Sequence, residues 1–172
     1  MKKIILALLV FGFTFSSSAQ DQEKPYVAPK HFLGVHAGFT TGRGLSYRYW
    51  PSKFGGEITA APRFKKGGQY SISTGLSLLY KLKETKRYTA YAYVGNSLLA
   101  TKAKSESYNP ITQISTYKIK ETTIYNASLG LGYKINFWDN LDFNVQLGYG
   151  FYEITTDFNT NITSEISMYY HF

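Results

Sequence analysis

Alternation of apolar and polar residues runs through most of this chain and limits what it can fold into. In segment 141–151 the odd-numbered residues are apolar or aromatic, and the even-numbered residues are Asp, Asn, Gln or Gly. The same period of two recurs in 70–80, 125–134 and 165–172. A period of two places successive side chains on opposite faces of a strand, whereas a helix needs a period near 3.6. The pattern therefore predicts an all-β protein with two-faced strands.

Eight such segments are separated by turn-forming or polar residues. The predicted strands are 31–40, 43–50, 54–64, 69–82, 87–100, 121–135, 140–152 and 162–172. The orientation of strand 87–100 stays open, because Tyr91 and Tyr93 share a face with Gly95 while Ala92 and Val94 share the other.

Short and longer connections alternate along the chain. Short turns lie at 51–53, 83–86 and 136–139, and the more polar connection 101–120 is about 20 residues long. Barrels that span a bacterial outer membrane have short turns at one end, longer loops at the other and aromatic girdles. Aromatic residues gather at the short-turn end, where a girdle would lie, although ordinary core packing near the hairpins is the alternative: Trp50, Phe54, Tyr88, Phe137 and Trp138. We therefore predict an eight-stranded antiparallel up-and-down transmembrane β-barrel over 31–172.

The polar face of the strands argues against a soluble barrel. A soluble barrel must present a charged outer surface to water. Charged residues make up only 17% of this chain, and the less apolar face is mostly Gly, Ser, Asn and Thr. Such small residues suit a narrow interior, although a soluble ligand-binding barrel stays an alternative. The absence of cysteine excludes disulfides, zinc–thiolate sites and cysteine nucleophiles.

The N-terminus has the pattern of an export signal. Lys2 and Lys3 precede an apolar run at 4–15, and small residues follow at 16–19. A membrane-spanning helix needs ~20 apolar residues, so this run is too short to be an anchor. We expect a cleaved signal peptide over 1–19 and a periplasmic lead over 20–30.

Together these features resemble the small eight-stranded outer-membrane β-barrels of Gram-negative bacteria, the broad grouping of OmpX, the OmpA barrel and OmpW. The resemblance covers about 32–172 and identifies no subfamily. It implies a place in the bacterial outer membrane, among its lipids and lipopolysaccharide. The final strand is similar to the aromatic-ended signal that the barrel-assembly machinery reads in that family, with alternating residues Ile166, Met168, Tyr170 and Phe172.

Charged residues on the less apolar face form a candidate lumen network: Arg48, Glu57, Arg63, Lys81, Lys134, Asp142 and Glu165. An unpaired ion in a poorly hydrated interior costs several kcal/mol, so these charges need partners. If the first short turn pairs residue 50 with residue 55, Arg48 falls opposite Glu57. A turn centred on residue 138 places Lys134 opposite Asp142.

Basic residues gather at the end with the longer connections, which we expect to be extracellular: Arg43, Lys65, Lys66, Lys102, Lys104, Lys118 and Lys120. Cations at a membrane surface are candidate contacts for the phosphates of lipopolysaccharide. The alternative is an ordinary solvated surface. An exported barrel is not expected to bind nucleic acid.

The sequence offers little for catalysis. A hydrolase needs a hydroxyl, a histidine and a carboxylate together near the rim, but His31 and His171 fall at the periplasmic end and His36 falls within a strand. We expect no catalytic residue, metal or cofactor. The predicted function is a non-catalytic outer-membrane barrel with a filled lumen and a structural or surface-interaction role. The alternatives are passage of small or hydrophobic solutes and a lipid A-modifying enzyme.

Overall fold

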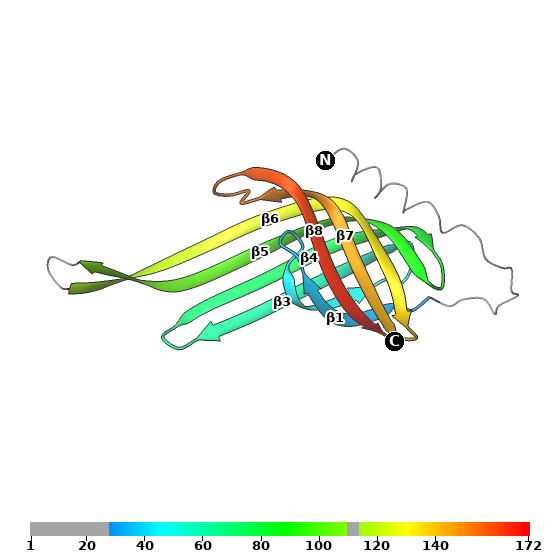
Figure 1. The fold of residues 1–172 in the computed structure, drawn as a ribbon, viewed down its shortest axis with the longest axis horizontal. Coiled ribbons are helices and arrows are strands. Elements are labelled where there is room, and N and C mark those ends of the chain that lie inside the picture. The colour runs from blue at the N-terminus through cyan, green and yellow to red at the C-terminus, as the bar shows by residue number, and fades with distance from the viewer. Residues whose placement is uncertain (1–27, 110–113) are drawn as a thin grey trace, which may run out of the picture.

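The computed structural model describes residues 28–109 and 114–172, with the backbone alone at 105–109, 114–116 and 118 (Figure 1). The expected signal peptide 1–19 and residues 20–27 of the expected lead lie outside the described residues. In the described part of the chain, no helix has the length and hydropathy needed to cross a bilayer.

Eight antiparallel strands close into a barrel, each paired with its neighbours in chain order and β8 paired with β1. The strands are β1 (His31–Ala37), β2 (Arg43–Tyr49), β3 (Phe54–Lys65), β4 (Gln69–Glu84), β5 (Tyr88–Asn109), β6 (Ile114–Trp138), β7 (Leu141–Tyr152) and β8 (Asn159–His171). The predicted eight-stranded up-and-down topology is confirmed, and most strand bounds agree within a few residues.

The β5–β6 connection differs most from its prediction. The expected polar connection over 101–120 is wrong, because β5 and β6 stay paired from Ala103 with Lys120 as far as Asn109 with Ile114. The resulting hairpin projects well beyond the other strands (Figure 1). Residues 114–125 are rich in Ile, Thr and Tyr, which belong to the β-branched and aromatic types that are enriched in strands.

The β1–β2 hairpin is shorter than predicted. β1 ends at Ala37 rather than at residue 40, and residues 38–42 turn into the barrel instead of extending the wall. The turn is closed by a 3.0 Å hydrogen bond from Gly38 N to Gly42 O, with Gly42 at a φ of 92°. Glycine adopts this conformation without the steric cost that other residues meet.

The barrel is apolar outside and polar inside. In β4, for example, Leu78 is 68% exposed while its neighbour Ser77 is 1% exposed. In β5, Tyr91 and Tyr93 face inward and Val94 faces outward, which settles the orientation that the sequence left open. A water-soluble barrel has the opposite arrangement, so this exterior is the surface of a barrel that faces lipid.

The aromatic residues predicted to form a girdle at the short-turn end lie on the outer surface, with one exception. Phe54, Phe137 and Trp138 are exposed on the outer surface, as predicted. Trp50 is 1% exposed and lies inside the barrel, so its assignment to the girdle is wrong. It follows Arg48 at the next inward-facing position, where alternation along β2 places it.

Candidate functional site: the polar interior

A buried ion pair joins β2 and β3. Arg48 and Glu57 are register partners, as the length of the first short turn predicts. Arg48 Nη2 lies 2.6 Å and Nε 2.8 Å from Glu57 Oε2, and neither side chain reaches solvent. Arg48 Nη1 also donates to Asn144 Oδ1 at 2.8 Å. The guanidinium therefore contacts both sides of the lumen.

Aromatic rings surround the same guanidinium. Arg48 Cζ lies 4.5 Å from the ring centre of Tyr169, 5.4 Å from that of Tyr91 and 5.5 Å from that of Trp50. Cations over aromatic faces are stabilised electrostatically, most strongly where water is excluded. Large inward rings need small neighbours: a Cβ on Gly132 would lie 2.2 Å from the Tyr91 ring. The part of the lumen near the short turns is thus filled by inward-facing side chains of the barrel.

His36 links this pair to a second carboxylate. Its Nδ1 lies 3.0 Å from Glu57 Oε1 and its Nε2 lies 3.3 Å from Glu165 Oε2, with all three side chains buried. An imidazole that faces a carboxylate with each nitrogen can donate to both only when doubly protonated. In that form His36 and Arg48 balance the charges of Glu57 and Glu165. Such balance is what buried ions require.

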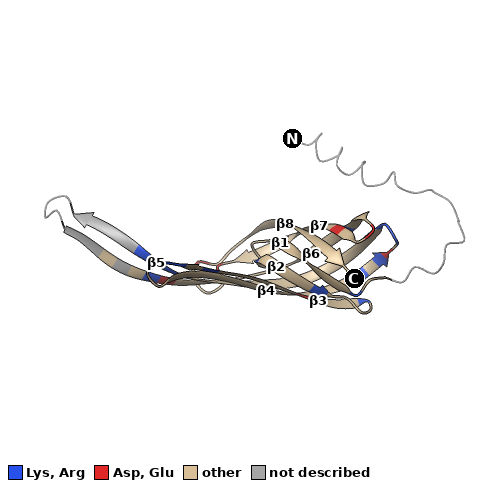
Figure 2. Cartoon of the chain, turned by 90° about the horizontal axis from the view of Figure 1, so that it is seen from below, with Lys and Arg blue, Asp and Glu red and all other residues tan. Residues whose placement is uncertain are grey.

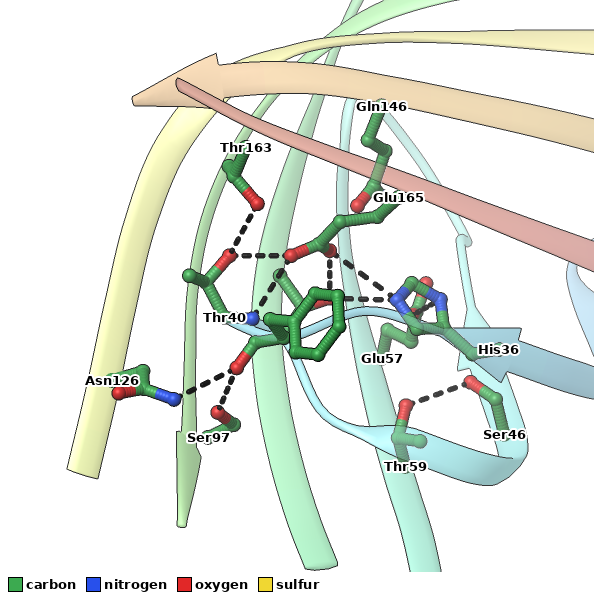
Figure 3. A network of polar contacts seen from close by, with 12 residues as sticks. His36, Thr40, Ser46, Glu57, Thr59, Ser97, Asn126, Gln146, Thr163 and Glu165 are labelled. Atoms are coloured by element: carbon green, nitrogen blue, oxygen red, sulfur yellow. Dashed lines mark hydrogen bonds and ion pairs between the residues drawn. The ribbon is translucent and has the colours of Figure 1, made fainter. Parts of the chain in front are cut away.

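Glu165 also holds the inward β1–β2 turn (Figure 3). Its Oε1 accepts from Thr40 N at 3.1 Å and from the Thr40 hydroxyl, and its Oε2 accepts from the Thr41 hydroxyl. The Thr41 hydroxyl lies 2.6 Å from His36 Nε2. One carboxylate on β8 therefore fixes the turn and the histidine together.

The far side of the same turn is held by β5 and β6. Ser97 Oγ and Asn126 Nδ2 each donate to Phe39 O at 2.9 Å (Figure 3). β4 approaches the turn closely, since a Cβ on Gly75 would lie 1.8 Å from Thr41 O. Residues 38–42 therefore cross the lumen and are attached to strands on opposite sides of it.

A second ionic cluster lies at the end of the barrel with the short turns. Asp142 Oδ2 is 2.9 Å from His171 Nδ1 and 3.6 Å from Lys134 Nζ. The expected register of this turn is wrong, because Asn136 faces Asp142 and Lys134 faces Asn144. The β6–β7 turn is centred on residues 139–140 with a bulge before it, so the pair forms diagonally.

Two members of the expected lumen network lie outside the buried clusters. Arg63 is exposed, because β2 pairs with β3 only up to Ala60 and does not extend beside the later residues of β3. Lys81 lies at the mouth with the short turns, where its Nζ is 2.8 Å from Glu84 Oε1. The prediction for Arg63 is therefore wrong, whereas Lys81 faces inward at the mouth of the lumen, with its Nζ 5.1 Å from the ring centre of Trp50.

Sequence reasoning missed the parts of the network that depend on closure. His36 and His171 lie on inward faces, as their alternation indicates, but nothing local shows that they pair with acidic residues. Thr40 and Thr41 were expected at the end of a strand and in a turn, not inside the barrel. Their inward position follows from the early end of β1, for which the only local signal is the pair of glycines at 38 and 42.

Thr41, His36 and Glu57 follow one another as hydroxyl, imidazole and carboxylate. This order occurs in hydrolases, where the hydroxyl must reach a substrate carbonyl. Here all three side chains are fully buried. The Thr41 hydroxyl already donates to Glu165, and the same carboxylate contacts His36 Nε2. The arrangement fixes the position of the β1–β2 turn, and the buried Thr41 hydroxyl has no access to a substrate carbonyl. No group of three or more potential metal ligands occurs among the described residues.

The basic residues predicted at the extracellular end lie at three places along the chain, and Figure 2 shows Lys and Arg in blue on the β5–β6 hairpin and also at the opposite end of the barrel. Arg43 begins β2, Lys65 and Lys66 lie at the β3–β4 turn, and Lys102, Lys104 and Lys120 lie on the β5–β6 hairpin; the side chain of Lys118 lies outside the described residues. Lys102 Nζ pairs with Glu121 at 2.8 Å, and this carboxylate raises the pKa of Lys102. Lys104 Nζ lies 3.7 Å from the ring centre of Tyr117.

The strand ring, the apolar exterior and the filled interior together define an eight-stranded β-barrel of the membrane type. No family model matches the sequence, and no curated protein matches it.

Among solved structures, the chain is similar to the N-terminal β-barrel domain of Pseudomonas aeruginosa OprF, with 12% identity, a TM-score of 0.48, and coverage of 83% of this chain and 96% of that one. It is also similar to Neisserial surface protein A, with 13% identity, a TM-score of 0.40, and coverage of 83% and 97%. A third similar structure is Ail, the attachment invasion locus protein of Yersinia pestis, in complex with the heparin analogue sucrose octasulfate. It has 17% identity, a TM-score of 0.34, and coverage of 83% and 99%.

Proposed function

We propose that this protein is a non-catalytic integral barrel of the bacterial outer membrane, with a structural or surface-interaction role carried by its extracellular end. The observation that carries the proposal is the combination of an apolar exterior with an interior closed by its own side chains. An apolar exterior needs lipid, and a filled interior leaves the projecting hairpins as the accessible functional surface.

The closed interior speaks against solute passage. The lumen of an eight-stranded barrel is just wide enough for side chains. Here Arg48, Glu57, His36 and Glu165 form a chain of contacts across it, and residues 38–42 lie above them. Water or a small solute would have to break several buried ionic contacts to pass.

The projecting hairpins support a surface role. A membrane-spanning strand needs ~9 to 11 residues, whereas β5 has 22 and β6 has 25. An even number of strands places both chain ends on one side, which we assign to the periplasm. The excess length of β5 and β6 then stands outside the cell.

Lipopolysaccharide is the partner that the extracellular cations fit. Lys102 and Lys104 lie on the outward face of the hairpin, above the lipid-facing residues of β5, with Ile119 exposed beside them. Ammonium groups at this level can contact phosphates while the neighbouring apolar side chain contacts lipid. We propose no nucleic-acid partner.

Assembly by the barrel-assembly machinery is proposed for the last strand. Ile166, Met168 and Tyr170 are exposed on the outer face of β8, and Phe172 follows them. Phe172 N donates to His31 O at 3.1 Å, and the two rings stack with their centres 5.8 Å apart. The end of the chain thus closes the barrel against β1.

Fractionation of expressing cells, followed by electrophoresis with and without boiling, tests the proposal. We expect the protein in the outer-membrane pellet, with a faster-migrating folded form that boiling converts to the unfolded form. Recovery in a soluble fraction, or one mobility before and after boiling, contradicts it.

A further inference from the structure

The periplasmic mouth of the barrel holds a basic pocket that the proposed function does not use. Its volume is about 340 Å³, and its lining includes Lys30, Trp50, Lys53, Lys81, Lys83 and Glu84. We propose that this pocket binds the phosphate headgroup of an anionic phospholipid in the periplasmic leaflet. The proposal rests on the membrane location proposed above.

Hydrogen bonds from the main chain fix the positions of the pocket's walls. Trp50 N donates to Lys30 O at 2.7 Å, and Lys81 N donates to Lys53 O at 2.8 Å. The Trp50 indole Nε1 also faces Lys53 O at 3.4 Å. Segments from the start of the barrel, the β2–β3 turn and the end of β4 are therefore joined around one buried indole. The backbone that carries the lysines is thus held in place, which lowers the ordering cost of binding a ligand.

A β-bulge distributes the lysines of β4 over two faces. Lys81 pairs with Tyr91 and Lys83 pairs with Ala90, so Leu82 is the extra residue of the bulge. Without the bulge, Lys81 and Lys83 would face the same side. With it, Lys81 lies over the Trp50 ring inside the mouth, and Lys83 turns outward over the ring of Tyr88. Lys81 therefore lies on the inner side of the barrel mouth, and Lys83 lies on its outer side.

The pocket has an excess of positive charge. Four lysines line it, and Glu84 is the one carboxylate among its described lining residues. Glu84 is engaged by Lys81, at 2.8 Å. The charges of Lys30, Lys53 and Lys83 therefore have no balancing carboxylate within the described lining. Lysine ammonium groups bind phosphate as point charges, so a phosphate is the ligand that this lining fits.

The surface beside the pocket favours a lipid over a free anion. Leu82 belongs to the pocket lining and is exposed to the outside, and Phe54 and Tyr80 form an exposed ring pair with centres 5.0 Å apart just above it. A phospholipid with its phosphate in the pocket can lay its acyl chains along this apolar face. Inorganic phosphate would use the lysines and leave the apolar face without a role.

Native mass spectrometry of the folded, detergent-solubilised protein tests this assignment. The probes are phosphatidylglycerol, zwitterionic phosphatidylcholine and inorganic phosphate, each added to the native protein and to the double variant Lys53→Gln, Lys83→Gln. The matched control is Lys86→Gln, Arg87→Gln, which removes the same charge in the β4–β5 turn, at exposed positions outside the pocket lining. Heat-modifiable mobility is measured for every sample, so loss of the barrel fold is distinguished from loss of lipid binding.

We expect the native protein and the control to retain phosphatidylglycerol in preference to phosphatidylcholine. The double variant should lose affinity by about fivefold for each lysine removed. Equal retention of the two lipids, equal loss in both double variants, or displacement by inorganic phosphate at the same concentration as the lipid each overturn the proposal. If a folded, heat-modifiable barrel is never obtained, the proposed membrane function itself fails.

Discussion

Arg48 and Glu57 face each other across β2 and β3, with 2.6 Å between Nη2 and Oε2 and no solvent access to either side chain. Two stabilising features meet at this pair. Aromatic rings, including that of Tyr169, surround the guanidinium, and His36 connects Glu57 to Glu165. Removing either partner leaves the other ion buried and uncompensated, which is more costly than the net gain from the pair itself.

A double-mutant cycle on this pair should give a large coupling energy. We expect Arg48→Ala and Glu57→Ala each to lower the free energy of unfolding by about 3–5 kcal/mol, and the double variant to lose much less than the sum. Urea unfolding in lipid vesicles provides the measurement. A coupling energy near zero would show that the charges act independently and that the lumen is hydrated around them.

The inward β1–β2 turn should depend on glycine at position 75. A methyl group there would meet Thr41 O, so Gly75→Ala should destabilise the barrel by about 1–3 kcal/mol or displace the turn. Gly56→Ala is the matched control, because the nearest atom to its added Cβ is Ser77 O at 3.9 Å. Amide hydrogen exchange at residues 38–42 should quicken in the first variant alone. Equal exchange in the two variants would mean that β4 does not hold the turn.

The C-terminal residue should affect assembly. Deleting Phe172 removes its hydrogen bond to His31 O and the ring stack that closes β8 against β1. We expect less heat-modifiable protein in the outer membrane, measured at equal expression. Deletion without a change in folded yield would assign the assembly signal to other residues.

The orientation can be tested with single cysteines, since the chain has none of its own. Lys66→Cys lies at the β3–β4 turn and Lys53→Cys at the β2–β3 turn, and both positions are exposed. A membrane-impermeant thiol reagent added to intact cells should label the first and reach the second only after permeabilisation. The reverse pattern would invert the topology and place the β5–β6 hairpin in the periplasm.

Much of the wall and one ion pair could be predicted because the signals are local. Alternation assigns each strand residue to a face, and the short turn between Arg48 and Glu57 sets their register. The contact between His36 and Glu165 could not be predicted in this way, since 129 residues separate them and only closure of β8 on β1 brings them together.

Two further differences have separate physical causes. The extension of the β5–β6 hairpin was missed because the sequence 101–120 is mostly polar, and polarity alone resembles a loop. The diagonal contact of Lys134 with Asp142 was misplaced because the bulge before residue 138 shifts the register. Neither a bulge nor a solvated hairpin leaves a distinct mark in the alternation.

The claim that the barrel lies in a membrane with a closed interior is tested most directly by conductance across a planar bilayer. Protein is refolded into vesicles, shown to be heat-modifiable, and fused with the bilayer. We expect the current to stay at the level of the protein-free bilayer, because the ionic cluster and residues 38–42 fill the lumen. Reproducible unitary current steps from the native protein would contradict a closed interior.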